Sequence, residues 1–260
     1  MTTRSTRRSE RMSAILGRLT DSGSVHVGEL ARSLGVSEAT LRRDLALLEE
    51  QRLLTRTHGG ALAQDVAYEL PVRYRDGRHR DAKRAIARAA VRGLPSGPHV
   101  VSLTGGTTTS EVARRLSDRT DLTIVTNALN IAMDLVLRPR VKLIVVGGVS
   151  RPQSYELVGP WAEEVLSGIN IGTAFVGVDG VSVAGGLTTH DETEARTNRA
   201  MIARAQRVVV VADGTKVGRV TLARMADLDR VDELVTDGAA DAAELDALRA
   251  AGVRVTVAPL

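Results

Sequence analysis

Glycines and hydroxyl side chains cluster in one short segment, TGGTTTSEVARRL (residues 104–116), directly after an apolar run. Glycine lets backbone N–H groups face outward, hydroxyls add donors, and the helix that follows directs its positive N-terminus at the loop. This combination is typical of a phosphate-binding loop, although a plain strand-to-helix turn is the alternative. A nucleotide loop is excluded, because the segment lacks Gly-Lys-Ser/Thr and no G-x-G-x-x-G opens a helix after a strand.

Small and polar residues also follow the other apolar runs of residues 81–260. The runs are VVSL, LTIVTN, KLIVVGG, TAFVGVDG, VVVVADGTK, ELVTDG and VRVTVA, and stretches of helical pattern separate them. This alternation predicts an open, mainly parallel α/β sheet with helices on both faces. Ligands bind such sheets beyond the carboxyl ends of the strands. The candidate ligand-binding residues are therefore Gly105, Gly106, Thr107, Thr108, Thr109, Thr126, Asn127, Gly148, Asp179, Gly180 and Lys216.

Lysine is rare in this chain, since only Lys83, Lys142 and Lys216 occur among 35 basic residues. Lys216 follows a strand end, where it could contact an anion or be an ordinary surface lysine. The acids near His190 suit the positive end of a helix better than a metal site. The absence of cysteine removes thiolate zinc sites and cysteine nucleophiles. We expect no metal and no cofactor.

A different chemistry is indicated near the N-terminus. Within SEATLRRDLALLEE, one helix face offers side chains that can reach base edges and phosphates in a major groove. The candidates are Ser37, Glu38, Thr40, Arg42 and Arg43, and the two arginines are the strongest. A helix of this kind taken alone would more often be an ordinary solvated helix, so its setting in the chain decides the interpretation.

The elements around this helix follow the order of a helix-turn-helix. Apolar positions 12, 15, 16 and 19 predict a first helix over Ser9–Ser22, and VHV (residues 25–27) is expected to be extended. Leu30, Ala31 and Leu34 form a second stripe, Gly35 supplies the turn, and Ser37 caps the third helix.

TRTHGGA (residues 55–61) predicts a tight hairpin in which Gly59 and Gly60 allow the turn. Arg56 and His58 lie on its arms and are candidate DNA contacts of a wing, with a structural hydrogen-bonding role as the alternative for His58. The order of helix, turn, capped helix and wing favours binding of double-stranded DNA.

Composition supports this division of the chain. The net charge of +4 is concentrated in residues 1–62, which hold ten arginines against seven acids. We expect a winged helix-turn-helix DNA-binding domain at 1–62, a linker at 63–80 and an α/β domain at 81–260. Five aromatic residues in all argue against platforms for single-stranded nucleic acid. No long apolar stretch or secretory signal is evident, so we expect a cytoplasmic protein without a membrane partner; an Arg- and Ser-rich organelle presequence is the alternative.

The segment VGELARSLGVSEATLRRDLALLEEQRLLTRTHGGA (residues 27–61) resembles the signature of the DeoR family of bacterial transcriptional regulators. Thr40–Asp44 and His58–Ala61 match that signature directly. The resemblance continues through almost the whole chain. It implies a sensor domain that is similar in fold to ribose-5-phosphate isomerase and binds a phosphorylated sugar or polyol.

The resemblance also implies which residues of the sensor domain bind this effector. Gly106, Thr107 and Thr108 match the family's phosphate loop, while Thr126–Asn127 and Asp179–Gly180 match its Thr-Asn and Asp-Gly pairs. Gly186–Thr188 matches a Gly-Leu-Thr, which adds Thr188 to the candidates, and Asp213 with Lys216 matches an Asp-x-x-Lys. Thr104 is a departure, because the family commonly has aspartate there.

Three classes of protein compete on these observations. A sugar-phosphate isomerase or deaminase fused to a DNA-binding domain would need a positioned base, and VDGVSVAGGLTT lacks the second acidic pair and the lysine loop of the isomerases. An architectural DNA-binding protein would not need a large sensor domain. We therefore expect a regulator, not an enzyme, that binds its operator as a homodimer or homotetramer, most simply as a repressor released by its effector, with activation as the alternative.

Overall fold

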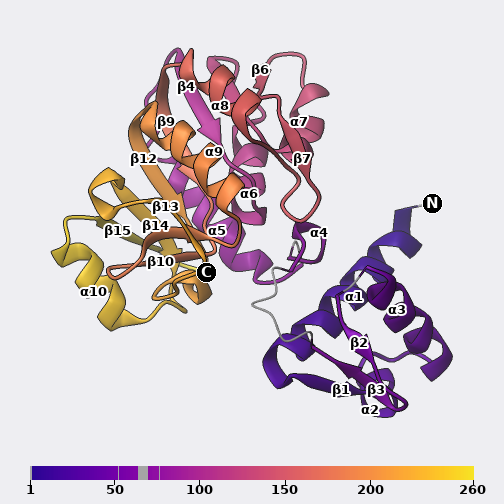
Figure 1. Cartoon of the computed structure of the whole chain (residues 1–260). Helices are drawn as coiled ribbons and strands as arrows, with labels where there is room; N and C mark the ends of the chain where they lie inside the picture. Colours follow the sequence, from indigo (N-terminus) through magenta and orange to yellow (C-terminus); the bar gives the residue numbers. More distant parts are fainter. Residues whose placement is uncertain (1, 52, 64–69, 76) are drawn as a thin grey trace. The chain divides into compact units, whose positions relative to one another are not determined.

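The computed structural model describes residues 2–51, 53–63, 70–75 and 77–260 (Figure 1). It divides into two compact units, Met1–Arg78 and His79–Leu260. No helix in these described ranges is both long enough and apolar enough to cross a membrane.

The N-terminal unit is a three-helix core with a small antiparallel sheet. Its strands pair in the order β1-β3-β2, and α1 extends further toward the N-terminus than the expected start at Ser9. The elements are α1 (Thr2–Ser22), β1 (Ser24–His26), α2 (Val27–Ser33), α3 (Glu38–Glu50), β2 (Thr55–Arg56), β3 (Gly60–Leu62) and α4 (Val72–Arg75). The predicted winged helix-turn-helix is thus confirmed.

The apolar stripes read from the sequence form the core of this unit. Its buried residues include Met12, Ile15, Leu16, Leu19, Leu30, Leu41, Leu45 and Leu48. Gly35 makes the turn with a φ of 64°, a conformation that suits glycine. Ser37 caps α3 by accepting the backbone N–H of Thr40 at 3.2 Å.

Part of the expected linker packs into the N-terminal unit. Leu70 and Tyr74 are buried in its core, and the Tyr74 hydroxyl donates to Gln51 Oε1 at 2.7 Å. The Ser13 hydroxyl also donates to the Tyr74 carbonyl oxygen. The polar sequence around Pro71 gave no indication of these contacts with α1 and with Gln51, which follows α3. The structure accordingly divides after Arg78, while residues 64–69 of the expected linker lie outside the described residues.

The second unit is built on a seven-stranded sheet in the order β15-β14-β12-β9-β4-β5-β6 (Figure 1). Every pairing in this sheet is parallel, as the alternation of strands and helices predicts. The strands are β4 (His99–Leu103), β5 (Leu122–Thr126), β6 (Lys142–Val145), β9 (Ile171–Val176), β12 (Ala205–Val211), β14 (Glu233–Asp237) and β15 (Arg254–Ala258).

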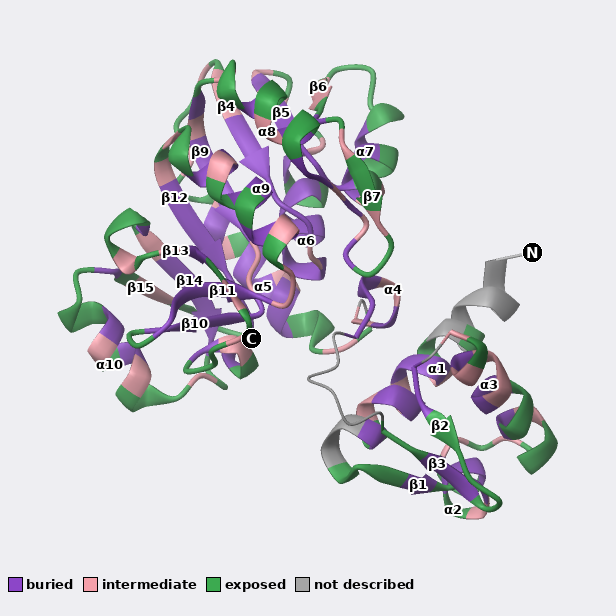
Figure 2. Ribbon diagram, in the orientation of Figure 1, coloured by how far each residue is buried: buried purple, intermediate pink, exposed green. Residues whose placement is uncertain are grey.

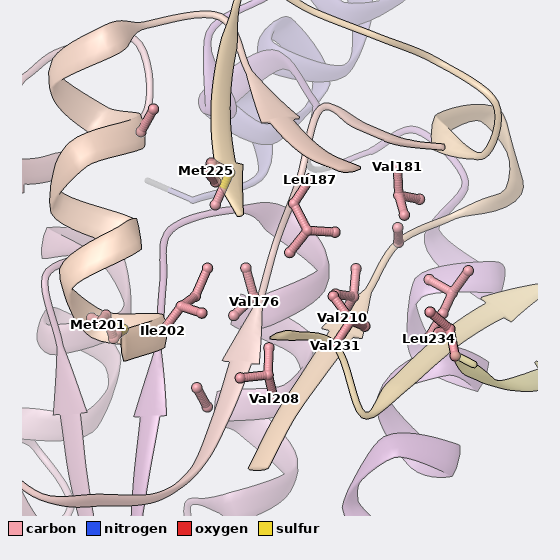
Figure 3. Close-up of a cluster of buried hydrophobic side chains, with 14 of the residues drawn as sticks. Val176, Val181, Leu187, Met201, Ile202, Val208, Val210, Met225, Val231 and Leu234 are labelled. Atoms are coloured by element: carbon pink, nitrogen blue, oxygen red, sulfur yellow. The ribbon is translucent and has the colours of Figure 1, made fainter. Parts of the chain in front are cut away.

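Helices cover both faces of this sheet, which is buried along its centre (Figure 2). One face packs on α5 and α6 through a cluster that includes Ile86, Val112, Phe175 and Val209. The other packs on α8, α9 and α10 through Val208, Val210 and their neighbours (Figure 3). The helices are α5 (Arg80–Val91), α6 (Thr107–Leu116), α7 (Leu129–Val136), α8 (Pro160–Ser167), α9 (Glu192–Ala203) and α10 (Ala242–Ala250), with short 3-10 turns η1 (Gly214–Lys216) and η2 (Leu228–Arg230).

Two antiparallel additions were not predicted from the sequence. β7 (Val149–Arg151) and β8 (Glu156–Val158) form a hairpin, and β10 (Gly180–Ser182), β11 (Gly186–Thr189) and β13 (Ala223–Ala226) form a small sheet. Their strands are too short to give a clear period. They nevertheless shape the candidate site of this unit, because they place polar residues at the ends of the parallel strands.

Candidate functional site

The exposed face of α3 carries the side chains predicted to meet DNA. Ser37, Arg42 and Arg43 are exposed, and Thr40 is half-buried. Arg42 Nη2 lies 3.1 Å from Glu38 Oε2 one turn earlier, in an exposed ion pair. Such a pair contributes only about 0–1 kcal/mol, so the guanidinium can be transferred to a phosphate or a base at little cost.

Asp44 lies on the opposite, buried side of α3 and connects this helix to α1. Its carboxylate is buried and lies 2.5 Å from Arg11 Nε and 3.5 Å from Arg8 Nε, both on α1. The aspartate that closes the LRRD segment is therefore a structural residue that orients α3 on α1. The apolar pattern gave no sign of this role, because Asp44 interrupts the leucine stripe.

The wing places Arg56 and His58 at the surface, as expected, but its glycines act differently from the prediction. Gly59 has open space around it and needs no special backbone conformation. A Cβ on Gly60 would lie 1.8 Å from the Val25 carbonyl oxygen, so Gly60 permits close pairing of β1 with β3. Arg56 lies 3.6 Å from Glu49 on α3, which ties the wing to the recognition helix.

In the second unit, the carboxyl ends of β4 and β9 form the switch point of the sheet. The chain runs from β4 through β5 to β6 on one side and continues from β9 on the other, which is where parallel sheets bind ligands. The Thr104 hydroxyl closes this point, because it accepts the Gly177 N–H at 2.9 Å. Thr104 is completely buried, and its hydroxyl also donates to the Gly105 carbonyl oxygen at 3.3 Å, so it stabilises the switch point.

The glycine-threonine loop leads directly into α6. Gly106 is the N-cap, with a φ of 126° that disfavours other residues. Thr109 and Ser110 hydroxyls both donate to the Gly106 carbonyl oxygen, at 2.9 and 2.7 Å. Thr107 and Thr108 start the helix. Within the described chain their hydroxyls form no hydrogen bond to other protein groups, so they are the hydroxyls of this loop best placed to bind an anion.

Several other candidates hold the backbone of the strand ends together. The Thr126 hydroxyl donates to the Leu103 carbonyl oxygen at 2.8 Å, and the Thr188 hydroxyl accepts the Thr221 N–H at 3.0 Å. A Cβ on Gly148 or Gly180 would fall within 2.8 Å of backbone oxygen atoms. Glycine is required at both positions because two chain segments pass close together. Whether these residues also touch a ligand stays a prediction.

Asp179 and Lys216 meet across the site, as their places after two neighbouring strands predict. Lys216 Nζ lies 3.3 Å from Asp179 Oδ1. The Thr189 hydroxyl oxygen lies 3.2 Å from Asp179 Oδ2 and 2.6 Å from Glu194 Oε1. Lys216 is partly exposed, so its ammonium can approach a ligand without crossing the core.

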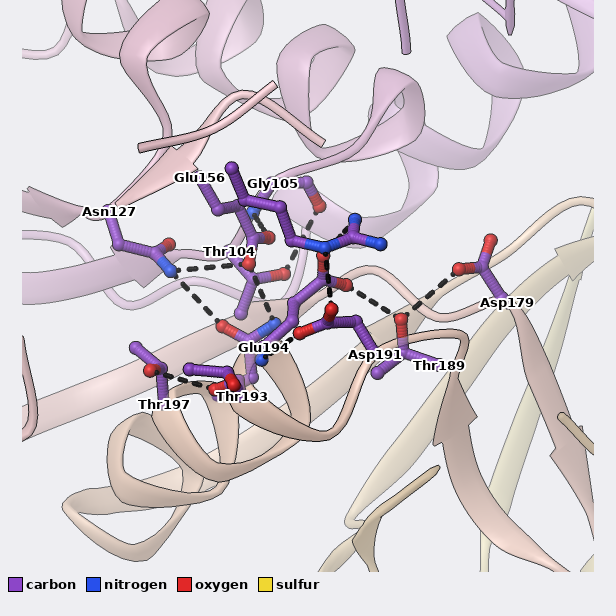
Figure 4. A network of polar contacts seen from close by, with 12 residues as sticks. Thr104, Gly105, Asn127, Glu156, Asp179, Thr189, Asp191, Thr193, Glu194 and Thr197 are labelled. Atoms are coloured by element: carbon purple, nitrogen blue, oxygen red, sulfur yellow. Dashed lines mark hydrogen bonds and ion pairs between the residues drawn. The ribbon is translucent and has the colours of Figure 1, made fainter. Parts of the chain in front are cut away.

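The centre of the network is Glu156, which the sequence analysis missed (Figure 4). Its Oε1 accepts the Gly105 N–H at 2.5 Å, and its Oε2 accepts amide N–H groups of Asn198 and Asn127 at 3.1 and 3.3 Å. Burial, together with the nearby charge of Glu194, raises the pKa of Glu156 well above its usual value against these hydrogen bonds. The only signal in the sequence was a glutamate between two apolar stretches, and the β7–β8 hairpin brings it here.

Arg151, also from that hairpin, neutralises the start of α9. Its guanidinium lies 3.1 Å from Asp191 and 3.0 Å from Glu194. Asp191 caps α9 through the Glu194 N–H at 2.8 Å. Burial acts against ionisation of Asp191, but this backbone N–H and Arg151 together hold its pKa below the usual value. Among the described residues, no group of three acids and histidines is arranged to hold a metal ion.

Comparison with known proteins decides the family. The model of the DeoR C-terminal sensor domain matches residues 78–238, and that of the DeoR-like helix-turn-helix domain matches residues 11–66. The chain belongs to the DeoR family. It is a DNA-binding transcriptional regulator with a helix-turn-helix domain followed by a sensor domain, and the resemblance identified from the sequence is confirmed.

Its relatives span nearly the whole chain. This DeoR-family protein is 40% identical over 250 residues to the "Putative aga operon transcriptional repressor" of Escherichia coli O157:H7, covering 95% of this chain and 93% of that one. It is 39% identical over 247 residues to the "HTH-type transcriptional regulator GlpR" of Haloferax volcanii, covering 95% and 96%. It is 32% identical over 231 residues to the "Glycerol-3-phosphate regulon repressor" of Escherichia coli K12, covering 89% and 91%.

Among solved structures, the ribose 5-phosphate isomerase A of Methanocaldococcus jannaschii matches with a TM-score of 0.40 and 18% identity, covering 55% of each chain.

Proposed function

We propose that this regulator represses carbohydrate genes and is released from its operator by a phosphorylated sugar or polyol. The observation that carries the proposal is the site at the β4–β9 switch point. There the N-terminus of α6, with the Thr107 and Thr108 hydroxyls, provides donors for a phosphate, while Asp179, Asn127 and Lys216 supply polar groups of both kinds. The printed names of the relatives, which include a glycerol-3-phosphate regulon repressor, are in keeping with such an effector.

DNA binding is assigned to α3 and the wing. Arg42 and Arg43 contact base edges in the major groove or neutralise the phosphates beside it. Ser37 and Thr40, at the start of α3, contact the DNA backbone. Arg56 and His58 contact DNA from the wing. The exposure of Arg42, Arg43, Arg56 and His58 supports this assignment. The regulator works in the cytoplasm, where the sequence predicts it.

We propose that two or more copies act together, because one small module makes too few base contacts for specific binding. An exposed apolar stripe on α7 supports a contact between copies. Four apolar side chains lie along one side of the helix and at its C-terminal end: Leu129, Met133, Val136 and Leu137. Met133 is 66% exposed and Leu137 is 79% exposed. Val145 on the neighbouring edge strand β6 adds to it. Light scattering at micromolar concentration is expected to show a dimer or a tetramer.

The experiment that tests the function is a thermal-shift screen of sugar and polyol phosphates, followed by two assays on each hit. We expect at least one hit to release DNA and none to be turned over, since VDGVSVAGGLTT lacks the second acidic pair and the lysine loop of the isomerases. Turnover of a bound sugar phosphate would instead establish the isomerase or deaminase alternative.

A further inference from the structure

One edge of the seven-stranded sheet is open. β6 is the last strand on its side and pairs with β5; no other strand of the described residues lies along its second edge. The Val146 N–H donates to the Thr126 carbonyl oxygen of β5 at 2.8 Å. Because backbone N–H groups alternate in direction along a strand, those of Leu143 and Val145 point to the open side. Such an edge is available for pairing with a further strand.

β6 carries little of the protection that natural sheets give to exposed edges. Edge strands are usually kept apart by charges, proline or a bulge. Lys142 stands at the start of β6, and the next six residues, LIVVGG, contain neither a charge nor a proline. Val145 is 43% exposed. It lies two residues after Leu143, which packs against the core under α7, so both side chains are on the α7 face of the sheet.

The exposed apolar stripe of α7 is directed away from α6, toward the same edge (Figures 1 and 2). The polar side of α7 faces α6: Asn130 Nδ2 donates to Ser110 Oγ at 2.9 Å, and Asp134 Oδ2 lies 3.7 Å from Arg114 Nε. Each residue of a helix is turned by about 100° from the one before it. The stripe around Met133 therefore lies on a different side of α7 from these polar contacts, and α7 is the helix next to β6 on this face.

The spacing of these elements allows one two-fold axis to join both features. α7 packs over both β5 and β6. Neighbouring strands lie about 4.8 Å apart, so pairing of β6 with its own copy places the axis about 2.4 Å from β6. A helix over the middle of the β5–β6 pair then lies about 4.8 Å from that axis. The two α7 helices would be about 10 Å apart, which agrees with the interaxial distance of about 8–10 Å for packed helices.

We propose that a second copy of this chain binds along this edge, so that the two β6 strands pair antiparallel and the two α7 helices pack through their apolar stripes. This inference rests on the proposed function, which requires more than one copy, and it names the surface that joins them. A two-fold interface presents the same patch from both copies. Large exposed apolar patches mark interaction surfaces, and here five apolar side chains of α7 and β6 are each between 37% and 79% exposed.

The charges beside this edge favour the antiparallel arrangement. Arg138, Arg140 and Lys142 are exposed and lie between the end of α7 and the start of β6. The other end of the edge, VVGG (residues 145–148), carries no charge. Antiparallel pairing places the cationic end of one copy beside the uncharged end of the other. A parallel arrangement would instead bring the two groups of cations together, and like charges repel.

The first test measures the self-association constant of the full-length protein by sedimentation equilibrium. Met133→Glu introduces a charge from each copy into the proposed helix contact, and it should raise the dissociation constant by about a hundredfold or more. A dimer is then converted to a monomer, or a tetramer to a dimer. Leu222→Glu, at a 79% exposed position just before β13, is the matched control and should keep the wild-type constant. Because both positions are exposed, both variants should keep the circular dichroism spectrum of the wild type.

A second variant tests strand pairing separately from helix packing. Val145→Pro removes an N–H group that points away from β5, and proline is tolerated on an edge strand when its missing N–H faces outward. The fold of the single chain should therefore persist, while the dissociation constant rises by about tenfold or more. A folded Val145→Pro protein that associates as tightly as the wild type would overturn the pairing of the two β6 strands.

Cross-linking locates the contact without weakening it. The chain has no cysteine, so a single Met133→Cys protein can be joined to another copy by a short bis-maleimide only through that residue. We expect covalent dimers from Met133→Cys and not from Leu222→Cys. Covalent dimers from Leu222→Cys alone, or an assembly that persists unchanged in Met133→Glu, overturn the inference. The copies then meet elsewhere, and the DNA binding and effector release of the proposed function are unaffected.

The wild type provides the remaining comparison. A protein that stays monomeric at micromolar concentration overturns this inference together with the proposal that several copies act together. If, in such a monomer, the thiol of Met133→Cys also reacts with a maleimide far more slowly than that of Leu222→Cys, another part of the same chain covers the α7 stripe. Release of DNA by a sugar phosphate is measured independently of both results.

Discussion

The exposed face of α3 and the polar network at the strand ends both carry charged side chains, but these side chains are held differently. Arg42 and Arg43 are exposed to solvent, and Arg42 forms a weak surface ion pair with Glu38. Glu156, Glu194 and Asp179 are buried. The Thr189 hydroxyl lies between Asp179 and Glu194, and Glu156 accepts hydrogen bonds from its own set of N–H groups. A surface that binds a large polyanion can consist of exposed side chains that change partners easily. A site for a small ligand has to be preorganised, and substitutions there affect neighbours as well as the ligand.

The largest expected effect is loss of stability of the N-terminal unit, which tests the DNA-binding side of this comparison. Gly60→Ala would place a Cβ against the Val25 carbonyl oxygen, at 1.8 Å, so β3 must separate from β1 at a cost of about 1–3 kcal/mol or more. Circular dichroism and DNA binding should show loss of the N-terminal unit's stability and of operator binding, while sugar-phosphate binding persists. Gly59→Ala, one residue earlier in open space, is the control and should bind DNA normally.

The next effect tests whether exposed charge on α3 is the DNA contact. Arg42→Ala and Arg43→Ala should each weaken binding to an operator recovered by in vitro selection by about 1–3 kcal/mol if the side chain reads a base. A phosphate contact would instead weaken all sequences and lower the salt slope by about one. Arg249→Ala, an exposed arginine on α10, removes the same charge elsewhere. Unchanged operator affinity in both α3 variants would show that another face binds DNA.

A third substitution separates the two units functionally. Lys216→Ala removes the cation proposed to bind phosphate, and it should weaken sugar-phosphate binding by about tenfold or more while operator affinity stays at the wild-type value. Lys142→Ala on the edge strand β6 is the matched control. Titration of DNA release with the effector measures both effects, and release at the wild-type effector concentration would exclude Lys216 from the site.

The smallest effect concerns stability and pH. Because burial and Glu194 raise the pKa of Glu156 in the folded protein, the stability associated with its protonated form is present below the unfolded pKa. It is lost as pH rises through the folded pKa. The melting temperature of Glu156→Gln minus that of the wild type should therefore increase from about pH 5 to pH 8. Glu164→Gln, an exposed change on α8, should show no such trend, and a flat difference for Glu156→Gln would mean that its charge is compensated in the free protein.

The same contrast explains what the sequence could predict. The stripe of Met12, Ile15, Leu16 and Leu19 and the cap at Ser37 are local signals, so the helix-turn-helix followed directly from spacing. The parallel sheet followed from repeated apolar strands. Glu156 could not be found in this way, because its partners Gly105 and Asn198 lie 51 and 42 residues away along the chain. Tyr74 was missed for a similar reason, since its burial depends on α1, 62 residues away.

The central claim is that the buried site and the exposed face are linked through the effector. The most direct test measures the coupling in both directions: operator affinity with and without a saturating sugar phosphate, and sugar-phosphate affinity with and without saturating operator. Thermodynamic linkage requires the same factor in both, and a coupling of about 1–3 kcal/mol predicts a factor of about 5–150. We expect the effector to weaken operator binding by such a factor and the operator to weaken effector binding equally. A sugar phosphate that binds tightly and leaves operator affinity unchanged would contradict the account.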